Sequence, residues 1–213
     1  MLKLKSKKYE LGFYKKGMTY VELIVVLSIF AVMSSVVMFN YGSFESKIDI
    51  KNVASDVGLK IVQAQKFSVN GKLPPLAQQT AIGEQIAGGI NAWKPSYGVY
   101  FNTTTDNKSF VYFTDVNQNG EYDVGSSPNV EFLETISINK GNYISNVEFL
   151  LPTGGSCLTT NALTIFFKRP DSGATFIPPA SSNCYARITV KTPSSADISS
   201  SIDVYPSGRI QIN

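Results

Sequence analysis

One stretch of the chain has the residue types and spacing of a cation-binding loop. Oxygen-bearing side chains recur there in the pattern D-x-N-x-N-G-x-x-D, and they belong to Asp115, Asn117, Asn119 and Asp123. The first part of an EF-hand loop presents oxygen ligands to Ca²⁺ at this spacing, with a glycine (here Gly120) at the sharp turn and a main-chain carbonyl (here of Glu121) as a further ligand. The pattern predicts a calcium site, although Ser126 stands at the twelfth position, where an EF-hand loop has an acidic residue.

A second interpretation of the same residues needs no ligand. Asn119-Gly120 is a dipeptide typical of a two-residue type I′ turn, in which both residues adopt the left-handed backbone conformation. The stretch would then be the tip of a β-hairpin. We favour the hairpin and keep the calcium site as the alternative.

The composition excludes much catalytic chemistry. The 213 residues include no histidine. This excludes imidazole acid–base catalysis, nucleophiles that depend on histidine, and zinc sites with imidazole ligands. The acidic residues show no spacing that supports a hydrolase with paired carboxylates. We therefore expect no catalytic residues and no enzymatic activity.

Cys157 and Cys184 are the only cysteines, and they are 27 residues apart. They lack the C-x-x-C spacing of a redox or metal motif. If this part of the chain faces an oxidising compartment, we expect a structural disulfide, worth about 3–4 kcal/mol by the chain-entropy model. Without such a compartment they would be two buried thiols.

Charge and hydropathy are uneven along the chain. The formal net charge is +3, but residues 1–17 contain six lysines and one acid, whereas residues 18–213 contain 13 basic and 15 acidic residues. Leu23–Phe39 is almost entirely apolar, and its length is at the lower limit for crossing a bilayer. Lysines before such a run predict that the tail stays in the cytoplasm. Glu22, at the start of the run, would be costly in a membrane and is therefore a candidate functional residue.

Three interpretations compete for this amino-terminal region. A secretory signal peptide would have a shorter apolar core and an A-x-A-like cleavage site, neither of which is evident. A plain membrane anchor fits the hydropathy but leaves Glu22 unexplained. The third interpretation is a processed signal that keeps its apolar segment, and it accounts for Glu22.

The stretch Gly17-Met18-Thr19-Tyr20-Val21-Glu22-Leu23-Ile24, preceded by two lysines, resembles the class III signal of type IV pilin-like proteins. The resemblance implies that a prepilin peptidase cuts after Gly17 and methylates the new amino terminus at Met18, where phenylalanine is commoner in the family. The apolar segment then remains as anchor and assembly helix. The resemblance also implies that Glu22, at the fifth mature position, pairs with the α-amino group of Met18 on a neighbouring subunit, because a buried carboxylate needs a partner.

A long helix is expected to follow the cleavage position. No proline lies between Met18 and Leu73, and one apolar stripe with helical spacing is formed by Ile50, Val53, Val57, Ile61 and Ala64. A helix from Met18 to about Asn70 would be about 80 Å long. We therefore divide the chain into a basic leader (1–17), a helix (18–72, with 18–41 as the transmembrane and assembly part) and a β-rich head (73–213).

Alternating segments predict strands in the head. The candidates are Tyr97–Phe101, Ser109–Asp115, Val130–Ile138, Tyr143–Leu150, Ala162–Lys168, Tyr185–Thr192, Ser201–Tyr205 and Arg209–Ile212. The first two read as a hairpin, and loops rich in Ser, Thr, Gly and Pro separate the others. A long helix followed by strands gives an α+β fold, with the helix packed on an antiparallel sheet.

The head most resembles the GspH/FimT-like group, the minor pseudopilin H of type II secretion and its pilus relatives. The resemblance lies in Gln63-Ala64-Gln65, in the stretch 113–123 and in Ser207-Gly208-Arg209-Ile210. It implies a non-catalytic minor pilin or pseudopilin of a type II secretion pseudopilus, a type IV pilus or a competence pseudopilus. Its partners would be other pilins, the prepilin peptidase and the inner (cytoplasmic) membrane, crossed once, with the head in the periplasm or outside.

A DNA-binding minor pilin acting in DNA uptake is the alternative function. Some FimT-like proteins are thought to bind DNA through a Gly-Arg-x-Arg ending, but here Gly208-Arg209-Ile210-Gln211 lacks the second arginine. The acidic head also disfavours phosphate contact, so DNA binding is not expected. Arg209 is its candidate residue, with Arg187 and Lys191 as possible neighbours in a local patch.

Overall fold

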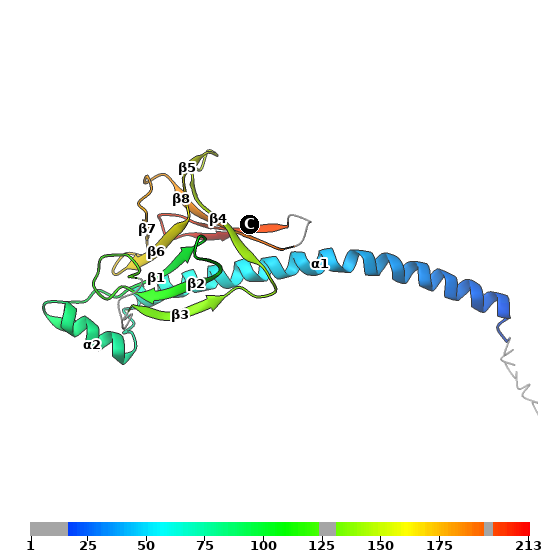
Figure 1. The fold of residues 1–213 in the computed structure, drawn as a ribbon, viewed down its shortest axis with the longest axis horizontal. Helices are drawn as coiled ribbons and strands as arrows, with labels where there is room; N and C mark the ends of the chain where they lie inside the picture. Colours follow the sequence, from blue (N-terminus) through cyan, green and yellow to red (C-terminus); the bar gives the residue numbers. More distant parts are fainter. Residues whose placement is uncertain (1–16, 124–130, 194–197) are drawn as a thin grey trace, which may run out of the picture. The chain divides into compact units, whose positions relative to one another are not determined.

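The computed structural model describes residues 17–123, 131–193 and 198–213. The chain divides into two compact units, residues 1–42 and residues 43–213. Helix α1 (Tyr20–Val69) contributes to both units, and every other helix and strand of the described residues belongs to the second. Figure 1 shows the order of these elements along the chain.

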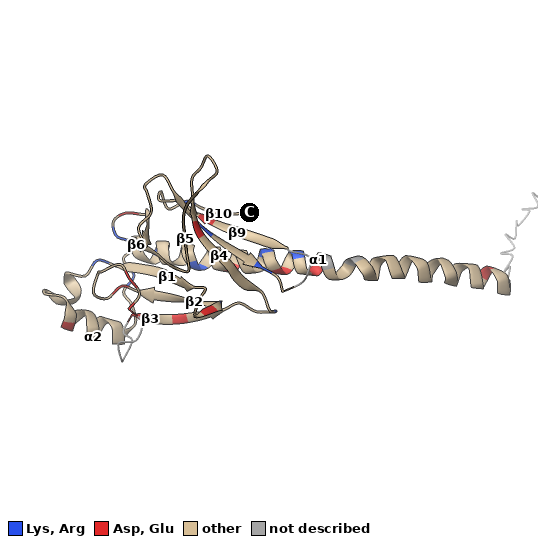
Figure 2. Ribbon diagram, turned by 45° about the horizontal axis from the view of Figure 1, so that its top comes forward, with Lys and Arg blue, Asp and Glu red and all other residues tan. Residues whose placement is uncertain are grey.

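In the first unit, α1 carries its apolar side chains on all sides. The large apolar residues between Met18 and Phe44 are all exposed, from 45% for Leu23 to 85% for Phe39. Figure 2 shows that this half of the helix is nearly free of charged residues. A helix that is apolar all round is typical of a segment buried by something outside its own chain.

In the second unit, α1 has one buried face. Ile50, Ala54, Val57, Ile61 and Ala64 are at most 2% exposed and lie in the core. They repeat at helical spacing, as the sequence predicts, with Val53 at the edge of the same face. The helix ends at Val69, just before Asn70-Gly71, where Gly71 takes a left-handed backbone conformation.

The strands of the described residues form two antiparallel sheets. Across the first sheet they are β3 (Phe132–Ser137), β2 (Asp106–Thr114), β1 (Ser96–Asn102), β6 (Ala162–Lys168) and β7 (Ala174–Ile177). Across the second they are β10 (Ile210–Ile212), β9 (Ser199–Val204), β8 (Tyr185–Lys191), β4 (Tyr143–Leu150) and β5 (Ser156–Thr160). One core joins both sheets to the buried face of α1, so the fold is α+β, as expected.

Most of the predicted strands are present within a few residues, and β4 and β6 have the predicted bounds. Four of the described elements were not predicted. Helix α2 (Leu76–Gln85) begins directly after Pro75, and a short 3₁₀ helix, η1 (Gly89–Asn91), follows it. Strands β5 and β7 lie at sheet edges, in stretches between the predicted strands.

Candidate functional site

The residues of the predicted processing signal lie at the start of α1. Gly17 and Met18 are exposed and precede the helix, and among the described residues no atom beyond the chain neighbours lies within 4 Å of the position that a Gly17 Cβ would take. Thr19 caps the helix, because its Oγ1 accepts a hydrogen bond from the Glu22 amide at 3.3 Å. Thr19 and Glu22 thus stand at the two positions of the capping-box sequence pattern.

The exposed apolar surface of α1 is the largest feature in the first unit. The helix is long and apolar enough to cross a membrane, and none of its most apolar stretch is buried. Exposed apolar area of this extent marks a surface that a membrane or another protein covers.

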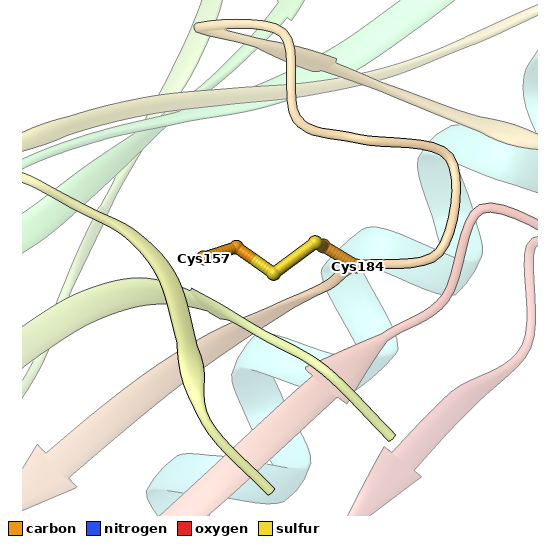
Figure 3. Close-up of a disulfide and its surroundings, with 2 residues drawn as sticks. All are labelled: Cys157 and Cys184. Atoms are coloured by element: carbon orange, nitrogen blue, oxygen red, sulfur yellow. A yellow bond between two sulfur atoms is a disulfide. The ribbon is translucent and has the colours of Figure 1, made fainter. Parts of the chain in front are cut away.

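Cys157 and Cys184 form a disulfide (Figure 3). Cys157 lies on the edge strand β5, and Cys184 directly precedes β8. Because β4 lies between these two strands, the bond ties the sheet edge to its interior across one strand. Cys184 is buried and Cys157 is exposed.

The stretch 115–123 is not a tight hairpin turn. Strands β2 and β3 do pair, but β2 ends at Thr114 and β3 begins at Phe132, so a wide connection joins them. Gln118 and Gly120 have positive φ, whereas a type I′ turn would need positive φ at Asn119 and Gly120. The predicted type I′ turn at Asn119-Gly120 is therefore wrong, although the strands on either side of the stretch pair as a hairpin.

Residues 115–123 instead cover the outer face of the first sheet. Gly98 lies opposite both Phe113 and Phe166, so these three residues share one face, while Tyr97 and Val99 point into the core. Side-chain packing joins the loop to that face. The Tyr122 ring lies 5.4 Å from that of Phe113 and 5.3 Å from that of Tyr100, and a Cβ on Gly120 would come 2.5 Å from the Phe166 ring. The loop is held by packing rather than by a local turn.

Asp115 is fixed at the start of this loop. It is 0% exposed, and its amide donates to the Ser96 carbonyl at 3.0 Å. Its carbonyl accepts from the Trp93 indole at 2.8 Å, and its Oδ2 accepts from the Gly120 amide at 3.0 Å. Burial raises the pKa of Asp115 to about 6, against the lowering effect of the Gly120 amide.

Glu131, which follows the loop, binds main-chain amides near both ends of it. It is 2% exposed, and its two carboxylate oxygens accept from the amides of Val116 and Asp123 at 3.1 and 3.0 Å. Burial raises the pKa of Glu131 to about 7, and the negative charge of Asp115 raises it further against those amides. Sequence reasoning missed Glu131, because it lies sixteen residues after Asp115, outside any EF-hand spacing.

The three other predicted ligands lie together on the exposed side of the loop. Asp123 Oδ2 accepts from the side-chain amides of Asn117 and Asn119, at 2.6 and 3.2 Å. The amide oxygens accept main-chain N–H groups, of Asn119 and Glu121 respectively. Within the described part of the chain, no three His, Cys, Asp or Glu side chains are grouped closely enough to hold a metal ion by themselves.

Arg209 follows a turn that α1 holds in place. The Gln65 side chain donates to the carbonyls of Ser172 and Gly208, at 2.7 and 2.9 Å. The Arg209 guanidinium lies over the Tyr205 ring, 3.8 Å from its centre. Two of the three stretches that carry the GspH/FimT resemblance, 63–65 and 207–210, are thus in direct contact.

Arg187, a neighbour suggested for a DNA-binding patch, is engaged within the second sheet. It donates two hydrogen bonds to Asp203, at 2.7 and 2.8 Å, and these raise the pKa of the guanidinium. Because an acid already compensates its charge, Arg187 adds little to attraction for phosphate.

Comparison with known proteins leaves the family open. No family model and no curated protein matches the chain. Among solved structures, the type IV minor pilin FimU of Pseudomonas aeruginosa is similar, with 10% sequence identity and a TM-score of 0.41. The match covers 80% of this chain and 92% of that chain. A likeness at this level gives no information about function.

Proposed function

We propose that the chain is a minor pilin or pseudopilin, a non-catalytic filament subunit of a type II secretion pseudopilus or type IV pilus. A prepilin peptidase removes residues 1–17 and methylates Met18. The apolar half of α1 then anchors the subunit in the cytoplasmic membrane, with the head on the far side. On assembly, the same half packs against other pilins, and Glu22 pairs with the α-amino group of Met18 on a neighbouring copy.

The observation that carries this proposal is the all-round exposure of apolar side chains directly after the processing motif. A plain anchor accounts for the apolar surface alone. The motif adds a glycine at the boundary, lysines before it and an acid at the fifth position of the mature chain. Together they support an apolar segment that is first held in lipid and later buried against other helices.

Glu22 offers a sharp test, because its position in the capping-box pattern and its charge can be separated. Glutamine can replace glutamate in a capping box, so Glu22→Gln keeps the start of the helix but removes the negative charge. We expect the variant to be processed and kept in the membrane but lost from sheared filaments. The measurement is the amount of the chain in the filament fraction relative to the membrane fraction, in cells that supply the other pilins and the peptidase.

Glu45→Gln is the matched control, since Glu45 is an exposed acid on the same helix outside the apolar run. It should enter filaments at the wild-type level. Filament levels of Glu22→Gln equal to those of wild type and control would contradict the proposed charge pairing. Absence of the wild-type chain from filaments would contradict the proposed function itself.

A further inference from the structure

The connection between β2 and β3 concentrates acidic residues. Residues 115–131 include four acids, Asp115, Glu121, Asp123 and Glu131, and no lysine or arginine. Two of these, Asp115 and Glu131, are almost completely buried, and no ion pair among the described residues involves either. Lys168 lies across β1 from the start of the loop. Its positive charge lowers the pKa of Asp115, but the described side chains of these two residues form no ion pair. Buried carboxylates are normally paired with a cation, bound to a metal or protonated.

Asp115 also has an oxygen without a partner. Its Oδ2 accepts the Gly120 amide, whereas its Oδ1 is buried and has no hydrogen-bond partner among the described residues. The main-chain amides of Gln118 and Asn119 also face this carboxyl group and lower its pKa. An orphaned oxygen on a buried carboxylate is costly, and such atoms in native proteins call for an ion, a water or a functional reason. This atom lies at the first position of the loop, where an EF-hand loop has its first ligand.

Three further oxygen-bearing side chains of the loop converge. Asn117 and Asn119 both direct their amides to one oxygen of Asp123, so the side chains at positions 3 and 5 of the loop each lie within hydrogen-bond distance of the one at position 9. Each amide oxygen accepts one main-chain N–H and keeps a second lone pair. The two side-chain amides offset only part of the negative charge of Asp123, and a cation bound here would neutralise more of it.

From these observations we infer that the loop is a calcium site, with Asp115, Asn117, Asn119 and Asp123 as side-chain ligands and Glu131 as the residue that positions them. Glu131 holds the amides of residues 116 and 123, and so fixes both ends of the ligand segment. Although Glu131 lies beyond the twelve residues of an EF-hand loop, it holds the two ends of the ligand segment together. This inference does not depend on the proposed filament function.

Ca²⁺ is the cation that this donor set suits. The donors are carboxylate, amide and main-chain oxygens. They include no sulfur or imidazole, the ligands that zinc and copper prefer. Ca²⁺ accepts several neutral oxygens in irregular geometry, whereas Mg²⁺ requires near-ideal octahedral coordination.

Trp93, the only tryptophan of the chain, makes the site directly measurable. Its indole donates to the Asp115 carbonyl, so it lies beside the first proposed ligand. Tb³⁺ takes oxygen ligands as Ca²⁺ does, and it emits when a nearby indole transfers energy to it. With the full-length chain in detergent and stripped by a chelator, we expect saturable Tb³⁺ emission on excitation of Trp93, displaced by Ca²⁺ and not by equal Mg²⁺. Ca²⁺ at 100 times its Kd should also raise Tm by about 5–10 °C.

Variants separate the ligands from the positioning residue. Asp115→Asn and Asp123→Asn should abolish Ca²⁺-displaceable emission. Glu131→Gln should reach the wild-type plateau at a Ca²⁺ concentration about 10–100-fold higher, as for a residue that orients ligands. Asp171→Asn is the matched control, because Asp171 is an exposed loop aspartate whose Oδ1 accepts a main-chain amide. It should behave as wild type.

Two results would overturn the inference. One is wild-type protein with no Ca²⁺-displaceable emission and no Ca²⁺-dependent change in Tm. The other is emission that persists unchanged in both Asp115→Asn and Asp123→Asn. The wild-type measurement decides the question even if a variant fails to fold.

Discussion

At the scale of single residues, Gly208 shows why the carboxyl-terminal turn requires a glycine. Its φ of +82° lies in the left-handed region, and a Cβ there would overlap the Ser172 carbonyl oxygen and the Gln65 side-chain amide. The position thus combines a backbone requirement with close contact to α1. The sequence marks Gly208 only as part of a resemblance, whereas the structure supplies its physical reason.

Gly208→Ala should therefore destabilise the head more than its backbone conformation alone would. Left-handed alanine costs about 1–2 kcal/mol, and displacing the Gln65 amide adds the loss of hydrogen bonds worth about 1 kcal/mol each. We expect a loss of about 2–4 kcal/mol in the free energy of unfolding, measured by denaturant titration of the full chain in detergent.

Gly154→Ala is its control, because Gly154 has the same φ of +82° with no atom within 4 Å of its Cβ position. Its loss should be limited to the conformational cost of about 1–2 kcal/mol. Equal losses in the two variants would show that contact with Gln65 and Ser172 contributes nothing.

At the scale of elements, the disulfide secures a strand that packing holds weakly. All five residues of β5 are exposed or half-buried, and β5 is bonded to β4 alone among the described strands. The bond to Cys184 connects this edge to a buried position in the second sheet. An exposed edge strand that is tied down is also less available for pairing with other chains.

Replacing both Cys157 and Cys184 by alanine should lower the free energy of unfolding by about 3–4 kcal/mol, because the unfolded chain regains the entropy of the open loop. Hydrogen exchange should rise first in β5. The measurement is denaturant unfolding of wild type and variant, each with and without reductant. A reductant effect on the double variant as large as that on the wild type would contradict this account.

The strands show how far local pattern predicts this fold. Alternation along Tyr143–Leu150 and Ala162–Lys168 gives the bounds of β4 and β6, because each has one face in the core. It fails for β5 and β7, edge strands that pair with the strands just before them in the chain, because β5 has no buried residue and β7 is only four residues long. For residues 115–123, the preference of Asn119-Gly120 for a tight turn is overridden by packing of Tyr122 on the first sheet and by Glu131. The local sequence of the loop indicates neither the packing of Tyr122 nor the contacts of Glu131.

At the scale of the whole molecule, the chain has three segments that differ in charge. A lysine-rich tail precedes an uncharged apolar helical segment, and the rest carries slightly more acidic than basic residues. Lysines before an apolar segment hold the tail on the cytoplasmic side of a membrane. If the chain is a filament subunit as proposed, the tail must be present during insertion and absent from the assembled subunit.

Intact mass of the chain recovered from membranes of cells with their native peptidase tests this claim most directly. The account predicts a protein that begins at Met18, without residues 1–17, and carries one added methyl group. A full-length chain, or one cut beyond residue 39, would contradict it, and the apolar segment would then be a plain anchor or a removed signal.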